Sequence, residues 1–316
     1  MQLATVLTPI SDENLALAAQ CGVTELVARY FGSDAAELQR VQQWAERFGM
    51  NVSVVEGYLP IERLKLGTDD GSELAAMKLL LRQMSDAGVK LLCYNFMSGT
   101  DWVRTRVDAP ERGGATVTEF RLADVERAVS LNTRATPSSA VVTQEQLWQN
   151  LDRFLTELLP AAEQCGVTLT MHPDDPPLPQ LLGRARIMHC VENFERLVTE
   201  WASPSNQICF CQGSFASMGV DIPSAIRRLG PHIKYVHFRD VRGTPDAFAE
   251  TFHDNGPTDM AAAMRAYAEV GFNGPMRPDH VPAFVGEQGE PGYTMLGRLF
   301  AYGYMRGLID AVQATT

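Results

Sequence analysis

Glycine recurs in this sequence at the point where a predicted helix ends and a short apolar segment begins. The junction occurs at Gly22, Gly49, Gly88, Gly166 and Gly271. Glycine just past a helix end readily takes the left-handed conformation that caps the helix, and a segment typical of a strand follows each time. Repeated helix–glycine–strand junctions are typical of alternating β/α units, whose strands form a parallel sheet.

Eight short apolar segments fit the strands of such a sheet. They are Leu3–Leu7, Glu25–Arg29, Asn51–Glu56, Lys90–Asn95, Val167–His172, Gln207–Cys211, Ile233–Phe238 and Gly274–Arg277. Helical patterns between them include Asp34–Phe48, Glu73–Ala87, Gln144–Gln164, Thr258–Val270 and a last helix from about Tyr293 to Val312. Eight strands in 316 residues predict an α/β fold, a (β/α)8 TIM barrel that forms a single domain over residues 1–316. The competing fold is a doubly wound parallel sheet, but no Gly-x-Gly-x-x-Gly motif follows the first strand.

Residues 98–142 do not fit the repeat. They follow the fourth predicted strand and are rich in Arg, Thr, Gly and Ser. Loops of this length inside a compact domain are usually functional or mobile. A loop after a barrel strand lies over the C-terminal face, where TIM-barrel enzymes carry their active sites, so we expect this long loop to border the site.

The composition excludes several classes of protein. With 27 Lys and Arg against 38 Asp and Glu, the net charge is −11, which argues against a nucleic acid or an anionic membrane as partner. No apolar stretch approaches the roughly 20 residues that span a bilayer, and the N-terminus lacks the pattern of a secretory signal. The six cysteines form no Cys-x-x-Cys pair. We therefore expect free thiols and a cytoplasmic protein.

Four potential metal ligands lie at the same end of four consecutive predicted strands. His172, Cys211 and His237 end or nearly end their strands, and Asp279 follows the eighth. Their spacings of 39, 26 and 42 residues each correspond to about one β/α unit, so the four side chains can converge. Imidazole, thiolate and carboxylate together suit Mn, Fe, Co or Zn better than Mg or Ca. The sequence therefore predicts a site for a divalent metal.

Other residues of these types have a simpler interpretation. A single His or Cys at a strand end is more often a buried residue than a ligand, and the register of four is what favours a metal. We interpret Cys209 as a small buried side chain one layer below Cys211. His189 and His232 lie away from strand ends, and we interpret them as structural or surface residues.

Two further segments contain candidates for substrate binding and proton transfer. Asp174 and Asp175 follow His172 in a Pro-rich stretch, where a carboxylate could orient a substrate or a ligand. The alternative for this stretch is a solvated turn. His280 directly follows Asp279, and histidine is the side chain best suited to move a proton near neutral pH.

These residues stand in motifs that resemble those of the mannonate dehydratases, which are xylose-isomerase-like barrels. The matching stretches are Cys93–Met97, Asp101–Thr105, Met171–Pro177, Phe210–Ser214, Val236–Asp240, Glu250–His253 and Arg277–His280, with Gly286–Glu287, Gly292–Tyr293 and Gly303–Met305 near the end of the chain. The resemblance extends from about Leu66 to Leu308. Several of these motifs are long enough to be specific.

The resemblance implies a reaction and roles for the matching positions. It implies a divalent ion, most commonly Mn²⁺, bound by His172, Cys211, His237 and Asp279, with acid–base roles for His280 and Tyr293. The family's chemistry removes the proton α to the carboxylate of a sugar acid and expels the neighbouring hydroxyl, which gives a 2-keto-3-deoxy acid. On the same motifs we expect substrate contacts from Asn95, Trp102, Arg104, Asp174, Arg239 and His253.

The sequence departs from the family pattern in four places. The first strand, Leu3–Thr8, lacks the usual Trp- and Arg-containing stretch, and Pro60–Glu62 stands where a polar ring or amide is usual. The insertion after Thr105 is short, and Arg239-Asp240 replaces Arg-Asn. These changes affect the expected substrate wall more than the reaction, so they predict that D-mannonate is a poor substrate.

Two other functions remain open on the sequence alone. A metal-dependent isomerase or epimerase of a keto-sugar could use the same barrel, metal and acid–base pair. Such an enzyme returns the proton to the substrate, whereas a dehydratase expels a hydroxyl. A non-catalytic sugar-acid-binding protein is the alternative from another class, and the complete set of candidate ligands and acid–base residues disfavours it. In every case the partner is a small sugar acid or keto-sugar, and we expect a homo-oligomer.

Overall fold

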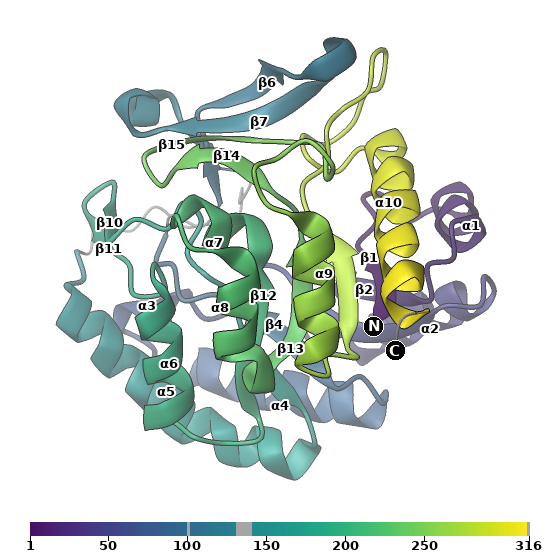
Figure 1. Cartoon of the computed structure of the whole chain (residues 1–316). Coiled ribbons are helices and arrows are strands. Elements are labelled where there is room, and N and C mark those ends of the chain that lie inside the picture. The colour runs from purple at the N-terminus through teal and green to yellow at the C-terminus, as the bar shows by residue number, and fades with distance from the viewer. Residues whose placement is uncertain (100–101, 131–140, 315–316) are drawn as a thin grey trace.

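Eight parallel strands close into a barrel in the computed structural model, which describes residues 1–99, 102–130 and 141–314 (Figure 1). In order around the barrel they are β1 (Gln2–Thr5), β2 (Glu25–Arg29), β3 (Asn51–Glu56), β4 (Leu91–Tyr94), β9 (Thr168–Met171), β12 (Asn206–Cys211), β13 (Ile233–Phe238) and β16 (Pro275–Pro278). Pairing of Gln2 with Pro275 closes the ring between β1 and β16. The predicted TIM barrel is confirmed.

Helices cover the outside of the barrel (Figure 1). They are α1 (Asp12–Gln20), α2 (Ala35–Glu46), α3 (Glu62–Leu66), α4 (Ser72–Asp86), α5 (Gln144–Cys165), α6 (Val191–Glu200), α7 (Gln212–Ser217), α8 (Ile222–Leu229), α9 (Met260–Glu269) and α10 (Met295–Gln313), with short 3-10 turns at Arg112–Gly114, Leu122–Arg127 and Gly230–His232. The five helices predicted by range each begin and end within two residues of the observed bounds.

Local sequence accounts for where these helices start and stop. Thr143 and Gln146 form a capping box at the start of α5, which satisfies backbone N–H groups that have no partner within the helix. Gly166 ends the same helix with φ 63°, in the left-handed region. The other four predicted junction glycines also have positive φ, from 72° to 82°. The glycine pattern therefore marks real helix ends.

Residues 98–142 contain more structure than the predicted loop. They include β5 (Val103–Arg104), β6 (Arg106–Pro110), β7 (Thr116–Arg121) and β8 (Val129–Ser130), while residues 131–140 lie outside the described residues. β6 and β7 join β14 (Val241–Thr244) and β15 (Ala247–Glu250) in an antiparallel sheet of order β14-β15-β7-β6. This cap sheet lies across the top of the barrel in Figure 1. Its partner strands come from distant parts of the chain, so local sequence gave no signal for it.

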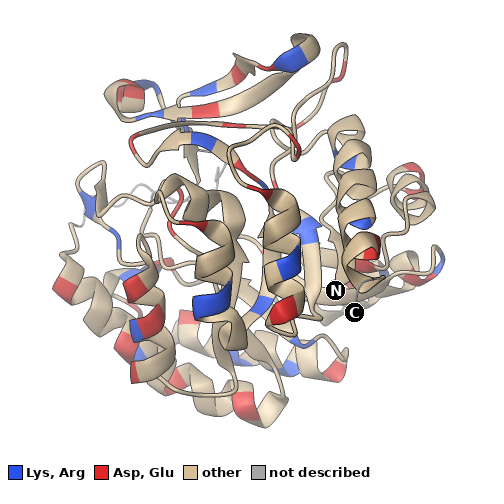
Figure 2. Cartoon of the chain, in the orientation of Figure 1, with Lys and Arg blue, Asp and Glu red and all other residues tan. Residues whose placement is uncertain are grey.

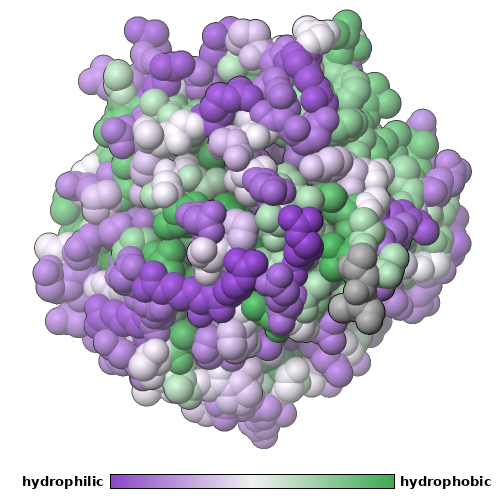
Figure 3. Space-filling model, in the orientation of Figure 1, coloured by the Kyte–Doolittle hydropathy of each residue, from purple (hydrophilic) through white to green (hydrophobic). Residues whose placement is uncertain are grey.

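A few smaller features complete the description of the fold. A short hairpin, β10 (Gln180–Leu181) with β11 (Arg184–Ala185), follows β9. Charged residues of both signs are interspersed over the ribbon in Figure 2, and hydrophilic residues are mixed with smaller hydrophobic areas on the face in Figure 3. Among the described residues, no helix is long and apolar enough to cross a membrane.

Candidate active site

A cavity of about 110 Å³ opens where the barrel strands end. Its lining comes from many elements: Arg29, Glu56, Gly57, Tyr58, Cys93, Tyr94, Asn95, Met97, Trp102, His172, Asp175, His237, Arg277, Asp279, His280, Glu290 and Tyr293. Most of these are at or just past the C-terminal ends of barrel strands, which is where TIM-barrel enzymes place their sites. The cavity is therefore the candidate active site.

The four predicted metal ligands come together at this cavity. Strand register pairs Cys211 with His237, and the candidate donor atoms of His172, Cys211 and His237 all lie within 4.8 Å of one another. Asp279 completes the group, with Oδ2 3.6 Å from Cys211 Sγ and Oδ1 3.8 Å from His237 Nδ1. The roles of these residues as ligands stay a prediction, but the donor set and its spacing fit a divalent ion of the Mn, Fe, Co or Zn type.

The charge state of this cluster also suits a metal. Burial acts to raise the pKa of the Cys211 thiol, but the Arg239 guanidinium and His172 hold that pKa well below its ordinary value. Burial conversely acts to lower the pKa of His172, and the charge on Cys211 raises it to about 10. Cys211 is therefore a thiolate, the form that binds metals.

Next to the four candidate ligands lies a buried network of two arginines and two carboxylates. Arg104 makes a two-pronged pair with Asp175, at 2.7 and 3.0 Å, and reaches Glu250 Oε1 at 2.7 Å. Arg239 contacts both acids at 2.8 Å and also places Nε 2.6 Å from Asp279 Oδ2. A Cβ at Gly213 would lie 2.6 Å from Arg239 Nη1, so only glycine leaves room for this guanidinium. The network fixes the position of the Asp279 carboxylate.

A second arginine holds Asp279 from the other side. Arg277 Nη1 donates to Asp279 Oδ1 at 2.8 Å, and Nη2 donates to Glu56 Oε1 at 3.0 Å. Tyr235 donates its hydroxyl to Glu56 at 2.9 Å. Burial acts to raise the pKa of Asp279, but His280 and Arg277 hold it well below its usual range. Asp279 is consequently ionised and oriented.

His280 and Tyr293 both line the cavity and contact each other. Nδ1 of His280 lies 2.9 Å from Glu250 Oε1, and the rings of His280 and Tyr293 meet edge-on with centroids 5.5 Å apart. Trp102 packs against the imidazole, also edge-on, at 5.2 Å. Burial and the charge on Asp279 raise the pKa of Tyr293, so its hydroxyl keeps its proton at neutral pH. The pair offers one imidazole and one phenol to a molecule in the cavity.

The residues expected to bind substrate fall into three groups. Asn95 and Trp102 line the cavity. Arg104 and Arg239 are fully buried behind it and position other side chains. Asp174 and His253 are buried and do not line it: Asp174 Oδ2 accepts from Met188 N at 2.7 Å, and the His253 ring stacks on Phe238. Asp175, the second carboxylate of the pair, is the one that reaches the cavity.

Several cavity residues were not predicted from the sequence as site residues. Arg29 and Glu56 end β2 and β3, and the strand-end reasoning that selected His172 would also have selected them. Glu290 and Tyr58 lie in loops without a motif. Asp240 stands where the family pattern has Asn after Arg239. It accepts a hydrogen bond from Thr258 N at 2.8 Å, so it holds a loop in place and does not bind a substrate.

Comparisons with known proteins agree with this geometry. The sequence model described as D-mannonate dehydratase (UxuA) matches residues 13–138 and 134–316. The mannonate dehydratase of Oceanobacillus iheyensis is 33% identical over 290 residues, 85% of this chain and 83% of that protein. The Thermotoga maritima enzyme of the same name is 32% identical over 308 residues, 87% of this chain and 85% of its own length.

Solved structures give the same result. The crystal structure of mannonate dehydratase from Streptococcus suis serotype 2 has a TM-score of 0.89 at 27% identity, covering 100% of this chain and 95% of that one. A structure of L-ribulose 3-epimerase has a TM-score of 0.63 at 14% identity, which shows a shared fold alone. The resemblance seen in the sequence motifs is confirmed, and the chain belongs to the D-mannonate dehydratase family of hydro-lyases.

Proposed function

We propose that this enzyme removes water from D-mannonate or a closely related sugar acid and releases a 2-keto-3-deoxy acid. The observation that carries the proposal is the cavity that His280 and Tyr293 share with His172, His237 and Asp279. Cys211 lies next to this cavity, with Sγ 3.6 Å from Asp279 Oδ2. Overall, the C2 proton and the C3 hydroxyl leave as water, and the resulting enol becomes the ketone. One imidazole and one phenol are enough to manage both proton transfers.

A divalent ion at His172, Cys211, His237 and Asp279 is part of this proposal. When bound, it would act as a Lewis acid toward oxygen atoms of the substrate, where negative charge develops. Arg239 and Arg277 hold the carboxylate of Asp279 in place, and Cys211 is already ionised. Mn²⁺ is the ion that we propose, on the family resemblance.

His280 serves as the base in this scheme. If Nδ1 donates its proton to Glu250 Oε1 at 2.9 Å, Nε2 carries a free lone pair and can accept the C2 proton. Tyr293 keeps its proton because burial raises its pKa, so it can donate to the departing hydroxyl. The two rings meet at 5.5 Å, a separation that allows both to reach neighbouring carbons of one substrate.

Arg29 is the group that we assign to the substrate carboxylate. Its side chain is 39% exposed, and its contact with Glu56 is long, at 3.3 Å. Arg277, by contrast, is buried and makes hydrogen bonds to Glu56, Tyr235 and Asp279. Arg29 lines the cavity, and a guanidinium can recognise a carboxylate through two parallel hydrogen bonds. On the position of Arg29 we propose an anionic sugar as the substrate in preference to a neutral keto-sugar.

The departures from the family pattern do not remove D-mannonate from the proposal. Pro60–Glu62 do not line the cavity, and Leu7 and Thr8 line an adjoining cleft that shares Arg29 with it. Most residues that line the cavity are therefore not among those that differ from the family pattern. On this ground we propose D-mannonate as a substrate, and the expectation from the sequence that it is a poor one stays a prediction.

A substrate panel tests the proposal. Protein loaded with Mn²⁺ is incubated with D-mannonate, other aldonates and keto-sugars, and formation of 2-keto-3-deoxy acid is measured. We expect turnover of D-mannonate with kcat/KM of about 10⁴ M⁻¹s⁻¹ or more. Turnover of keto-sugars with no product from any aldonate would contradict the proposal and favour an epimerase.

A further inference from the structure

Two thiols that the proposed reaction does not use lie next to the candidate metal ligands. Cys93 on β4 and Cys209 on β12 point into the barrel and are 5% and 0% exposed. Sulfur atoms of both residues and a ring nitrogen of His237 all lie within 4.8 Å of one another. The sequence predicted only a small buried side chain at Cys209.

These two cysteines are not joined by a disulfide. Both are free thiols, and β9 lies between β4 and β12 in the barrel. The two sulfur atoms and the imidazole are therefore all available to an ion.

The same spacing suits a bridging metal ion. Zn–S and Zn–N bonds of about 2.3 and 2.0 Å place the ligands of a tetrahedral ion about 3.5–3.8 Å apart, within the observed limit of 4.8 Å. Nε2 of His237 has no aligned hydrogen-bond partner among the described residues and lies 3.3 Å from Glu56 Oε2. Glu56 is thus near enough to supply a fourth ligand.

We propose that Cys93, Cys209 and His237 form a second metal site, specific for thiophilic ions such as Zn²⁺ and Cd²⁺, beneath the site of the proposed reaction. Cys93 lines the cavity, so an ion can reach the thiols from outside. Two thiolates favour Zn²⁺ or Cd²⁺ over Mn²⁺, which prefers harder ligands. An ion at this second site would inhibit the proposed reaction, because His237 belongs to both sites. This inhibitory role rests on the proposed function.

Cadmium binding tests the site without any substrate. The variant Cys211→Ala removes the thiolate of the first site, and its metal-free form is titrated with Cd²⁺ while the ultraviolet thiolate-to-metal charge-transfer band is followed. We expect about one Cd²⁺ per chain with an intense band. Adding Cys209→Ala or Cys209→Val should weaken binding at least tenfold, and adding Cys165→Ala, a thiol on α5, should change nothing.

If the charge-transfer band and the affinity for Cd²⁺ were unchanged in both Cys209 variants, the proposal of a second site would be overturned. This readout is independent of turnover, so failure of the proposed reaction leaves it intact. For the inhibitory role, the Mn²⁺-loaded wild type and Cys209→Ala are assayed with increasing Zn²⁺. We expect Cys209→Ala to need at least tenfold more Zn²⁺ for half inhibition, and equal sensitivity would overturn that role.

Discussion

Nδ1 of His280 lies 2.9 Å from Oε1 of Glu250, and this contact connects the candidate base to the buried charge network. Glu250 is itself held by Arg104 at 2.7 Å and by Arg239 at 2.8 Å. A carboxylate at Nδ1 fixes the tautomer and the ring orientation of a histidine, which leaves Nε2 to act on a substrate. The cap sheet is therefore part of the site, because β15 supplies Glu250.

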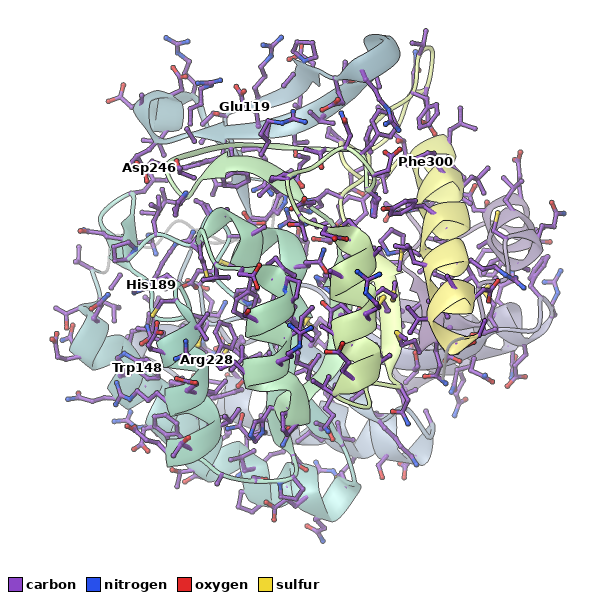
Figure 4. The ribbon with its side chains drawn as sticks, in the orientation of Figure 1. Glu119, Trp148, His189, Arg228, Asp246 and Phe300 are labelled. Atoms are coloured by element: carbon purple, nitrogen blue, oxygen red, sulfur yellow. The ribbon has the colours of Figure 1, made fainter. Side chains whose placement is uncertain are left out.

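His280→Ala tests the base. General acid–base catalysis contributes about 10²–10⁴-fold, so we expect turnover to fall by two decades or more while bound metal and thermal unfolding stay unchanged. His189→Ala is the control, because Figure 4 places His189 on the flank of the barrel beside α6. Loss of the metal in His280→Ala would show that His280 is a ligand and that the proposed set of four is wrong.

Tyr293→Phe removes the proposed acid and leaves the ring. We expect kcat to fall by about 10²-fold or more with little change in stability, since the ring still packs against His280. Tyr304→Phe, on α10, is the matched control. An unchanged kcat would mean that the departing hydroxyl receives its proton from another group.

Arg29→Gln tests recognition of the substrate carboxylate. We expect KM for a sugar acid to rise at least tenfold, because a charge-assisted pair contributes roughly 1.5–3 kcal/mol, and kcat to change less. Arg47→Gln alters an exposed arginine of the same half of the barrel and should leave KM unchanged. A normal KM in Arg29→Gln places the carboxylate elsewhere in the cavity.

Glu250→Gln tests the buried network through acid stability. Burial acts to raise the pKa of Glu250, but Arg239 and His280 lower it to about 2 from 4.5. The pKa of Glu250 is lower in the folded protein than in the unfolded chain. The contribution of Glu250 to the free energy of unfolding is therefore complete above pH 4.5 and is lost as the pH falls toward 2. That stabilisation is roughly 3 kcal/mol. Urea unfolding should therefore show a large gap between wild type and variant at pH 7 that narrows below pH 4.5.

The control for this experiment is Glu195→Gln. Glu195 pairs with Arg228 on the surface, where Figure 4 labels that arginine, and exposed pairs contribute little. A constant gap between Glu250→Gln and wild type across this pH range would mean that the Glu250 pKa is ordinary in the folded protein.

Metal removal tests the four ligands. Purified protein should contain about one divalent ion per chain, and Cys211→Ala should weaken its binding by at least tenfold, because it removes one of four ligands. Chelation should abolish activity and leave the barrel folded, because the apolar core between barrel and helices is separate from the rim. Metal-free protein with full activity would exclude the metal-dependent reaction.

The barrel and its candidate metal ligands could be predicted from the sequence because both follow from local patterns. Glycine caps and apolar segments mark each β/α unit, and residues at strand ends converge once the barrel closes. The cap sheet could not be predicted, since β7 pairs with β15 across more than a hundred residues. The choice between Asp174 and Asp175 was equally non-local, because it depends on where Met188 N and Arg104 lie.

Other predictions concern properties that the fold does not determine. The cytoplasmic location and the homo-oligomeric state stay predictions. The same holds for Mn²⁺ as the native ion, because the ligand types fit Fe²⁺, Co²⁺ and Zn²⁺ as well.

The reaction with D-mannonate in D₂O, followed by NMR and mass spectrometry, tests the central claim most directly. Loss of water through an enol predicts a 2-keto-3-deoxy acid that carries one solvent deuterium at C3 and none elsewhere, formed at least a hundredfold more slowly by His280→Ala. Recovery of the sugar acid with deuterium at C2, inverted or not, and without any 2-keto-3-deoxy acid would contradict the account.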